Sequence, residues 1–326
     1  MLNAAIVGLG RWGQVLVDAV QGRSGKIRFT AGATGRPERA AAYAARQGIE
    51  ILPDLETLLR RPEIEAVVLA TPHSLHGAQI AQAAAAGRPI LCEKPLTLTL
   101  AEARGAWGAA DRAGVLLAPA QNRRFLPAFR RLAELVQSGQ LGEVRQVIGN
   151  FSWGQAGHAP DSWRQSPAES PAGGMAGLGI HVVDAMIGLG LRGQGVRVTT
   201  RGADAERPHT VTAAIDFEGG AIGVLTTVGG PGRIWRLEVH GSEGYAAMDG
   251  ETRLVHARAG EPETRIDFGA FDKERAELEA FADALRGGAS WPVTRAEGLA
   301  AIALFEAICR GATLPGQDLE VEQAER

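Results

Sequence analysis

The most constraining feature of the sequence is a glycine-rich stretch between an expected strand and an expected helix. The apolar run 4–7 leads into Gly8-Leu9-Gly10-Arg11-Trp12-Gly13, and apolar residues at helical spacing follow over 15–20. In this context the first glycine permits a tight turn, the second lets the backbone approach a pyrophosphate, and the third allows close helix–strand packing. We therefore expect these six residues to form a dinucleotide-binding turn.

Strands and helices alternate through the first third of the chain. Apolar runs at 27–33, 49–52, 66–70, 90–92 and 115–118 are separated by segments with helical character at 37–47, at 54–60, from the stretch 71–76 to residue 86, and at 100–113. This alternation is typical of a doubly wound parallel sheet, so we expect an N-terminal Rossmann domain over residues 1–121.

The remainder, residues 122–326, predicts a C-terminal α+β domain with a large, mostly antiparallel sheet. Short strand-like segments separated by turns follow a helix that begins near residue 179; they lie at 196–201, 209–217, 221–228, 235–240, 245–249 and 253–257. They favour a meander with one face against helices. Helices expected at 273–285 and 295–309 would pack on this sheet or return to the first domain, and the acidic tail after 317 is expected to fray.

Length and charge limit the class of protein. A chain of 326 residues is longer than a domain with a single hydrophobic core usually is, so we expect two domains. Its net charge of -3, with acidic and basic residues interspersed, indicates neither nucleic acid nor a membrane as partner. Cys92 and Cys309 are too far apart in sequence to indicate a metal site or a disulfide framework. With no signal-peptide pattern and no membrane-length apolar run, we expect a soluble, cytoplasmic protein without a metal.

The residues after the second strand bear on cofactor choice. An Asp or Glu that would bind the ribose 2′-hydroxyl of NAD is missing, and Thr34-Gly35-Arg36 stands there instead. Because Arg36 can pair with a 2′-phosphate and Thr34 can donate a hydrogen bond, we expect NADP, with NAD as the alternative. The bland alternative is an Arg36 that only faces solvent.

Two further loops are expected at the ligand edge of the sheet. Thr71 and Pro72 follow the fourth apolar run, and His76 either caps the next helix or approaches the cofactor. Glu93-Lys94-Pro95 follows the buried run 90–92. A lysine whose stem lies against apolar walls can have its pKa lowered enough to exchange protons with a substrate near neutral pH, although a solvated Glu93–Lys94 pair is the plainer interpretation.

These motifs together resemble the Gfo/Idh/MocA oxidoreductases. The resemblance rests on GLGRWG, Thr71-Pro72 with His76, and Cys92-Glu93-Lys94-Pro95, and it continues through nearly the whole chain: Gln121 to Pro127, Ser138 to Val144, Trp163-Arg164, Gly179 to Asp184, Glu279 to Phe281 and Pro292 to Thr294. The family implies a Rossmann domain followed by a domain whose sheet packs against a second subunit, so we expect a homodimer or homotetramer.

The resemblance also implies site residues. Lys94 projects into the active site, and its bond to Pro95 is often cis in the family. His181 of the G-x-H-x-x-D run is the second active residue. Glu93, Lys94 and Asn122 join the residues expected to bind the cofactor.

The chain departs from the family pattern at Gly177, where many sugar and polyol dehydrogenases have an aspartate. Either Lys94 and His181 suffice, or Asp184 or Asp161 substitutes, although capping or solvation of its helix is the simpler role for Asp184. We place Asp184 with Trp163 and Arg164 among the expected substrate-binding residues. Trp153, His158, Trp163 and Arg164 lie in or beside an irregular stretch, 154–179, that would either meet a hydroxylated or acidic substrate or attach itself to the domain surface.

The resulting hypothesis is an NAD(P)-dependent oxidoreductase that moves a hydride between nicotinamide and a secondary alcohol or ketone of a sugar, cyclitol or related polyol. Lys94 would polarise the reacting oxygen and His181 would act as general base or acid. The alternatives are an imine or enone reductase, a nicotinamide-using glycosidase, and a non-enzymatic NADP-binding sensor.

Overall fold

The computed structural model describes residues 1–153, 162–202, 207–230 and 232–324. The chain forms two compact units, the first made of 1–122 with 272–294 and the second of 123–271 with 295–326. The sequence-based boundary assigned 272–294 to the second domain but left open that the helix at 273–285 returns to the first, and this segment does belong to the first unit. Each unit is described separately below.

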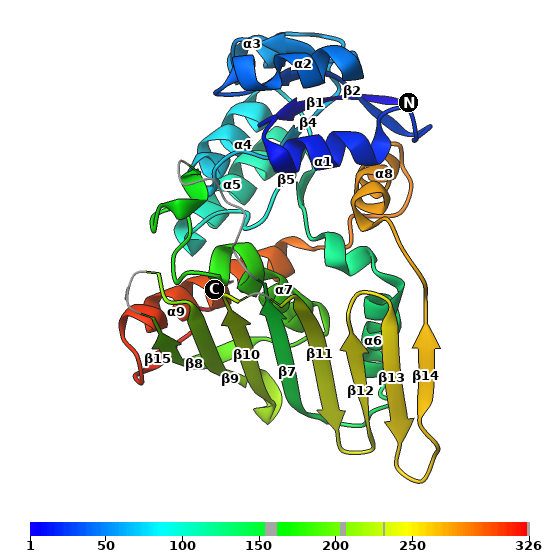
Figure 1. Ribbon diagram of the computed structural model, residues 1–326, viewed down its shortest axis with the longest axis vertical. Helices are drawn as coiled ribbons and strands as arrows, with labels where there is room; N and C mark the ends of the chain where they lie inside the picture. Colours follow the sequence, from blue (N-terminus) through cyan, green and yellow to red (C-terminus); the bar gives the residue numbers. More distant parts are fainter. Residues whose placement is uncertain (154–161, 203–206, 231, 325–326) are drawn as a thin grey trace. The chain divides into compact units, whose positions relative to one another are not determined.

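The first unit contains a six-stranded parallel sheet in the order β3-β2-β1-β4-β5-β6 (Figure 1). Its strands are β1 (Leu2–Val7), β2 (Ile27–Ala33), β3 (Glu50–Leu52), β4 (Ala66–Leu69), β5 (Ile90–Cys92) and β6 (Leu117–Pro119). Its helices are α1 (Arg11–Val20), α2 (Pro37–Gln47), α3 (Leu55–Leu59), α4 (His76–Ala85), α5 (Leu100–Ala113) and α8 (Lys273–Leu285), with 3₁₀ turns η1 (His73–Leu75) and η2 (Asn122–Phe125), the latter at the boundary. This is the Rossmann strand order, so the expected doubly wound fold is confirmed.

Local sequence explains where these elements begin and end. Strands β4 and β5 are fully buried and consist of apolar residues or cysteine, as expected for parallel strands covered on both faces. Helix α5 begins with a capping box between Thr99 and Glu102 and ends at Gly114, whose φ of 65° suits glycine. Helix α8 packs against α1 and β2, which explains why this late segment belongs to the first unit.

The second unit is built on a nine-stranded sheet in the order β14-β13-β12-β11-β7-β10-β9-β8-β15 (Figure 1). Its strands are β7 (Val144–Ser152), β8 (Gly193–Arg201), β9 (Thr210–Phe217), β10 (Ile222–Val228), β11 (Ile234–Gly241), β12 (Gly244–Asp249), β13 (Arg253–Arg258), β14 (Thr264–Asp267) and β15 (Asp318–Glu320). Its helices are α6 (Pro127–Gln137), α7 (Ile180–Gly188) and α9 (Arg295–Thr313), with the shorter turns η3 (Trp163–Gln165), η4 (Met175–Gly179) and η5 (Glu218–Gly220).

The sheet is mostly antiparallel, as expected, but it is not a simple meander. Strand β7 lies between β10 and β11 and pairs in parallel with β10. The alternation of apolar and polar residues is the same whichever strand is the neighbour, so the sequence pattern did not reveal this insertion. The expected frayed tail is also wrong in part, because β15 pairs with β8 and Arg197 forms a two-bond ion pair with Asp318.

One face of this sheet is covered by helices. A buried row crosses seven strands through paired positions: Val198, Ala213, Leu225, Gly149, Leu237, Met248 and Leu254. Gly149 lies under Val182 of α7, and Val198 lies under Gly311 of α9. The neighbouring row on the other face, which includes Ile148, Val224 and Glu238, is only partly buried. Among the helices formed by described residues, none combines the length and the apolar character needed to cross a bilayer.

Candidate active site

Four loops leave the first sheet at the carboxyl ends of its strands. Gly8 follows β1, Thr34 follows β2, Thr71 comes shortly after β4, and Glu93 follows β5. The strand order reverses between β1 and β4, and ligands of open parallel sheets bind outside the strand ends at such a reversal. The sequence-predicted loops are therefore brought to one edge of one sheet.

The glycine-rich turn fits a bound dinucleotide. Gly8 has a φ of 100°, and a Cβ there would lie 2.4 Å from the carbonyl oxygen of Ala70. A Cβ on Gly13 would lie 2.0 Å from the carbonyl oxygen of Gly8, whereas a Cβ on Gly10 would meet no atom within 4 Å. Gly8 and Gly13 thus close the turn. Gly10 leaves open space before the N-terminus of α1, where no side chain caps the helix.

Glu93 is tied to this turn. The indole Nε1 of Trp12 donates to Oε1 of Glu93 over 2.5 Å, and the backbone N–H of Lys94 donates to Oε2 over 3.3 Å. Glu93 is buried, so the solvated Glu93–Lys94 pair considered from sequence is wrong. Lys94 is half-buried, and the Lys94–Pro95 peptide bond is cis.

His76 joins two of the loops. It is buried at the start of α4, its Nδ1 lies 3.0 Å from the carbonyl oxygen of Pro95, and its Nε2 lies 3.2 Å from that of Thr71. Leu75 occupies the cap position of α4 and no side chain caps the helix, so the capping role considered for His76 is wrong. The imidazole instead links the loop after β4 to the loop after β5.

The other predicted cofactor residues have different surroundings. Thr34 is half-buried and Arg36 is exposed, directly before Pro37 opens α2. Pro72 is half-buried beside Thr71. Asn122 is buried, and its Nδ2 donates to Oε1 of Glu274 over 3.2 Å.

In the second unit, His181 lies in the first turn of α7. It is buried, and its ring centroid lies 5.7 Å from that of Phe151 on β7. A π-helical turn, η4, directly precedes it; such turns are frequent at functional sites. Gly177 lies in that turn, is exposed, and has no atom within 4 Å of the position a Cβ would take. A Cβ at residue 177 would therefore enter open space.

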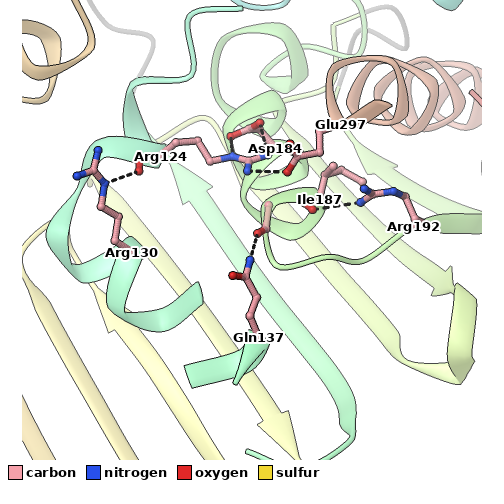
Figure 2. Close-up of polar contacts among 8 residues, drawn as sticks. Arg124, Arg130, Gln137, Asp184, Ile187, Arg192 and Glu297 are labelled. Atoms are coloured by element: carbon pink, nitrogen blue, oxygen red, sulfur yellow. Dashed lines mark hydrogen bonds and ion pairs between the residues drawn. The ribbon is translucent and has the colours of Figure 1, made fainter. Parts of the chain in front are cut away.

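Asp184 lies one turn beyond His181 on α7. It belongs to a buried ion-pair cluster with Arg124 and Glu297 (Figure 2). Its two carboxylate oxygens accept from Nε and Nη2 of Arg124 at 2.8 and 3.0 Å, and Nη1 of Arg124 donates to Glu297 at 3.0 Å. Burial raises the pKa of the Asp184 carboxyl above its ordinary value, and the charge of Arg124 acts in the opposite direction. The capping or solvated role expected for Asp184 is wrong, because the residue is interior to the helix and buried.

Sequence reasoning missed two arginines as site residues. Arg123 and Arg124 are both buried, and the Arg123 guanidinium carbon lies 4.4 Å from the ring centroid of Phe151 and 4.7 Å from that of Trp235. Phe151 in turn contacts His181. The family motif from Gln121 to Pro127 contains both arginines. Charged residues are seldom buried, however, and the sequence pattern does not indicate their partners.

The predicted loop residues are described in part. Trp163 and Arg164 are half-buried in η3, with the guanidinium carbon 4.1 Å from the indole ring centroid. Arg207 donates to Gln165 of the same turn, which attaches it to the unit. His158 and Asp161 lie outside the described residues. Within the described part of the chain, no three His, Cys, Asp or Glu side chains gather as metal ligands would.

Comparison with known proteins agrees with this architecture. Residues 2–121 match the oxidoreductase family with an NAD-binding Rossmann fold, and residues 129–247 match the GFO/IDH/MocA C-terminal domain. The rhizopine catabolism protein MocA of Rhizobium meliloti is 32% identical over 318 residues, covering 93% of this chain and 92% of that protein. Inositol 2-dehydrogenase of Rhizobium meliloti strain 1021 is 28% identical over 322 residues, covering 94% and 95%.

A solved structure has the same fold. Levoglucosan dehydrogenase in complex with NADH and L-sorbose superposes with a TM-score of 0.87 at 23% identity, covering 99% of each chain. The expected resemblance is confirmed by the family matches and the full-length relatives. The chain belongs to the GFO/IDH/MocA family of oxidoreductases, with an NAD-binding Rossmann domain at its N-terminal end.

Proposed function

We propose that the protein is an NADP-dependent oxidoreductase that transfers a hydride between nicotinamide and a secondary alcohol or ketone of a sugar, cyclitol or related polyol. The observation that carries the proposal is the glycine-rich turn of Gly8, Gly10 and Gly13 at the strand-order reversal, with the loop of Lys94 leaving the same edge of the sheet. The inositol and levoglucosan specificities of two relatives support the substrate class.

The proposed chemistry divides between the cofactor and two side chains. The dinucleotide, when bound, supplies or accepts the hydride. Lys94 hydrogen-bonds the reacting oxygen, and Glu93 and His76 hold the loop that carries it. His181 takes the alcohol proton in oxidation and returns it in reduction. The burial of His181 suits its role, since a positioned group shielded from water needs little rearrangement of solvent.

We propose that Trp163 and Arg164 contact the substrate. A half-buried indole with a guanidinium against its ring offers an apolar face for C–H groups and donors for hydroxyl groups. Both oxygens of Asp184 are bonded to Arg124, so we assign Asp184 a supporting role instead of direct substrate contact.

The preference for NADP rests on Arg36. No acid stands between β2 and Pro37, and Arg36 is exposed before α2. The Arg36→Ala variant is expected to lose affinity for NADPH by about tenfold or more while keeping its affinity for NADH, because a charge-assisted hydrogen bond contributes about 1.5–3 kcal/mol. Arg46→Ala, at the other end of α2, is the matched control. Equal affinity of the wild type for NADPH and NADH would contradict the proposed preference for NADP.

The deciding experiment measures turnover with a panel of polyols, cyclitols and sugars. Lys94→Ala and His181→Ala are each expected to reduce kcat/KM by about 10²-fold or more. Lys26→Ala, which removes an exposed lysine paired with Asp283, is expected to retain it. Wild-type turnover in both site variants would refute their assignment, and binding of dinucleotide without any turnover would favour the sensor.

We also propose a homo-oligomer formed through the open face of the nine-stranded sheet. The row that includes Ile148, Val224 and Glu238 mixes apolar and charged groups and is only partly buried. Ile148→Arg is expected to lower the mass measured by light scattering, whereas Leu314→Arg, an exposed position after α9, is expected to leave it unchanged. A monomeric wild type would contradict the proposal.

A further inference from the structure

Three residues form one stripe along α7. His181, Asp184 and Gly188 are spaced i, i+3 and i+7, so they lie on the same side of the helix. The Arg124 guanidinium lies across this stripe. It donates to both oxygens of Asp184, and a Cβ on Gly188 would lie 2.4 Å from its Cζ and Nη1. Gly188 thus provides the space that lets Arg124 approach the side of the helix that carries His181.

The arginine is itself fixed at several points (Figure 2). Its Nη1 donates to Glu297 on α9, and its carbonyl oxygen accepts from the Arg130 guanidinium over 3.3 Å. The C-terminal carbonyls of α7 are held separately, that of Ile187 by Arg192 and that of Gly188 by Gln137. These backbone bonds fix where the helix ends, whereas the bond to Asp184 fixes which way one side of it faces.

A buried ion pair of this kind fixes the relative orientation of its two side chains more than it stabilises the fold. Desolvation of two charges offsets much of their attraction, so well-packed apolar residues often stabilise a core as well. A two-bond Arg–carboxylate pair, however, is satisfied in one orientation only. The neighbouring Arg123 stacks on Phe151, which contacts the His181 ring, while Arg124 binds Asp184 on the same side of α7 as His181.

We propose that Arg124 and Asp184 are positioning residues for His181: their ion pair, made possible by Gly188 and anchored on Glu297, sets the rotation of α7 and with it the direction of the imidazole. The catalytic consequence rests on the proposed function of His181. A displacement of about 1 Å in a catalytic group costs on the order of 10²-fold in rate, so a small rotation suffices.

Two variants disturb the ion pair in different ways. Arg124→Lys keeps the positive charge but cannot form the two parallel bonds. Gly188→Ala changes no charge and favours the helix, but places a methyl group where the guanidinium lies. Each is expected to lower kcat by about 10- to 100-fold without changing dinucleotide affinity. Arg192→Lys is the matched control, because a lysine can still donate to the Ile187 carbonyl.

A second readout does not depend on turnover. NMR of ¹³C-labelled histidine gives one ring signal for each of the seven histidines, and the His181 signal is identified by its loss in His181→Asn. Arg124→Lys and Gly188→Ala are expected to shift this signal and its titration midpoint, and Arg192→Lys is not. These measurements are made below the melting temperature of each variant, and Glu297→Ala, which removes the acceptor of one bond of the cluster, replaces any variant that fails to fold.

The outcomes separate the two proposals. Variants that fold with a wild-type His181 signal, pH profile and kcat would overturn the positioning role and leave the proposed oxidoreductase intact. A wild type that turns over no alcohol or ketone, together with shifted His181 signals in the variants, would refute the proposed function while retaining the structural link between Arg124 and His181.

Discussion

The indole N–H of Trp12 donates to the carboxylate of Glu93, although 81 residues separate them in the sequence. Trp12 belongs to the glycine-rich turn after β1, and Glu93 directly precedes Lys94 after β5. One hydrogen bond therefore joins the expected dinucleotide turn to the loop that carries the proposed catalytic lysine. The two motifs form one structural assembly at the ligand edge of the sheet.

Trp12→Phe tests this connection. The variant keeps an aromatic ring but loses the donor to Glu93, and a hydrogen bond to a charged group contributes about 1.5–3 kcal/mol. We expect dinucleotide affinity, measured by fluorescence quenching or calorimetry, to fall about tenfold or more. Glu93→Gln keeps an acceptor oxygen and is expected to fall less. Equal affinities for Trp12→Phe and the wild type would show that the bond has no role in binding.

The glycines of the turn are expected to differ in the effect of a methyl group. Gly13→Ala places a Cβ 2.0 Å from the Gly8 carbonyl oxygen, so the free energy of unfolding should fall by about 1–3 kcal/mol or more. Gly10→Ala meets no protein atom within 4 Å, so stability should change by less than about 1 kcal/mol while dinucleotide affinity falls. Denaturant titration measures the loss of stability, and binding assays measure the loss of dinucleotide affinity. A Gly10→Ala variant that binds dinucleotide normally would contradict the proposed binding role of the glycine-rich turn.

Gly177→Asp tests the open position before His181. No atom lies within 4 Å of the Cβ position, so the substitution is expected to be accepted by the fold. A carboxylate near the imidazole favours its protonated form, so the limb of the pH–rate profile that reports the neutral base should move upward by about one pH unit. Gly177→Asn has nearly the same size without the charge and should leave the limb in place. An unmoved limb in Gly177→Asp would mean that residue 177 does not face His181.

Cys92 is expected to be chemically inert in the folded protein. It is fully buried on β5, and burial raises the pKa of its thiol well above the ordinary value. In a Cys309→Ser background, a thiol reagent should react only after unfolding, and the rate for the native protein should not rise between about pH 7 and 9, where a free thiol of pKa about 8.5 ionises. Rapid labelling that follows this ionisation would contradict the buried position.

Much of the first unit could be predicted from sequence because its signals are local. The bounds predicted for β2, α2 and α5 agree with the structure, since strand burial, a first-turn proline and a glycine after the helix act within a few residues. The four loops at the ligand edge were also predicted, because strand ends in a parallel sheet fix which loops meet.

The tertiary structure alone decided the rest. The sequence by itself determined the glycine-rich turn, the parallel sheet and the loop of Lys94, because each follows from a pattern of neighbouring residues. Burial of Arg124 depends on Asp184 and Glu297, which lie 60 and 173 residues away, and the insertion of β7 and the return of α8 likewise depend on distant segments. An arginine in a sequence carries no sign of its partners, because the energy that permits a buried charge comes from groups that only folding brings together.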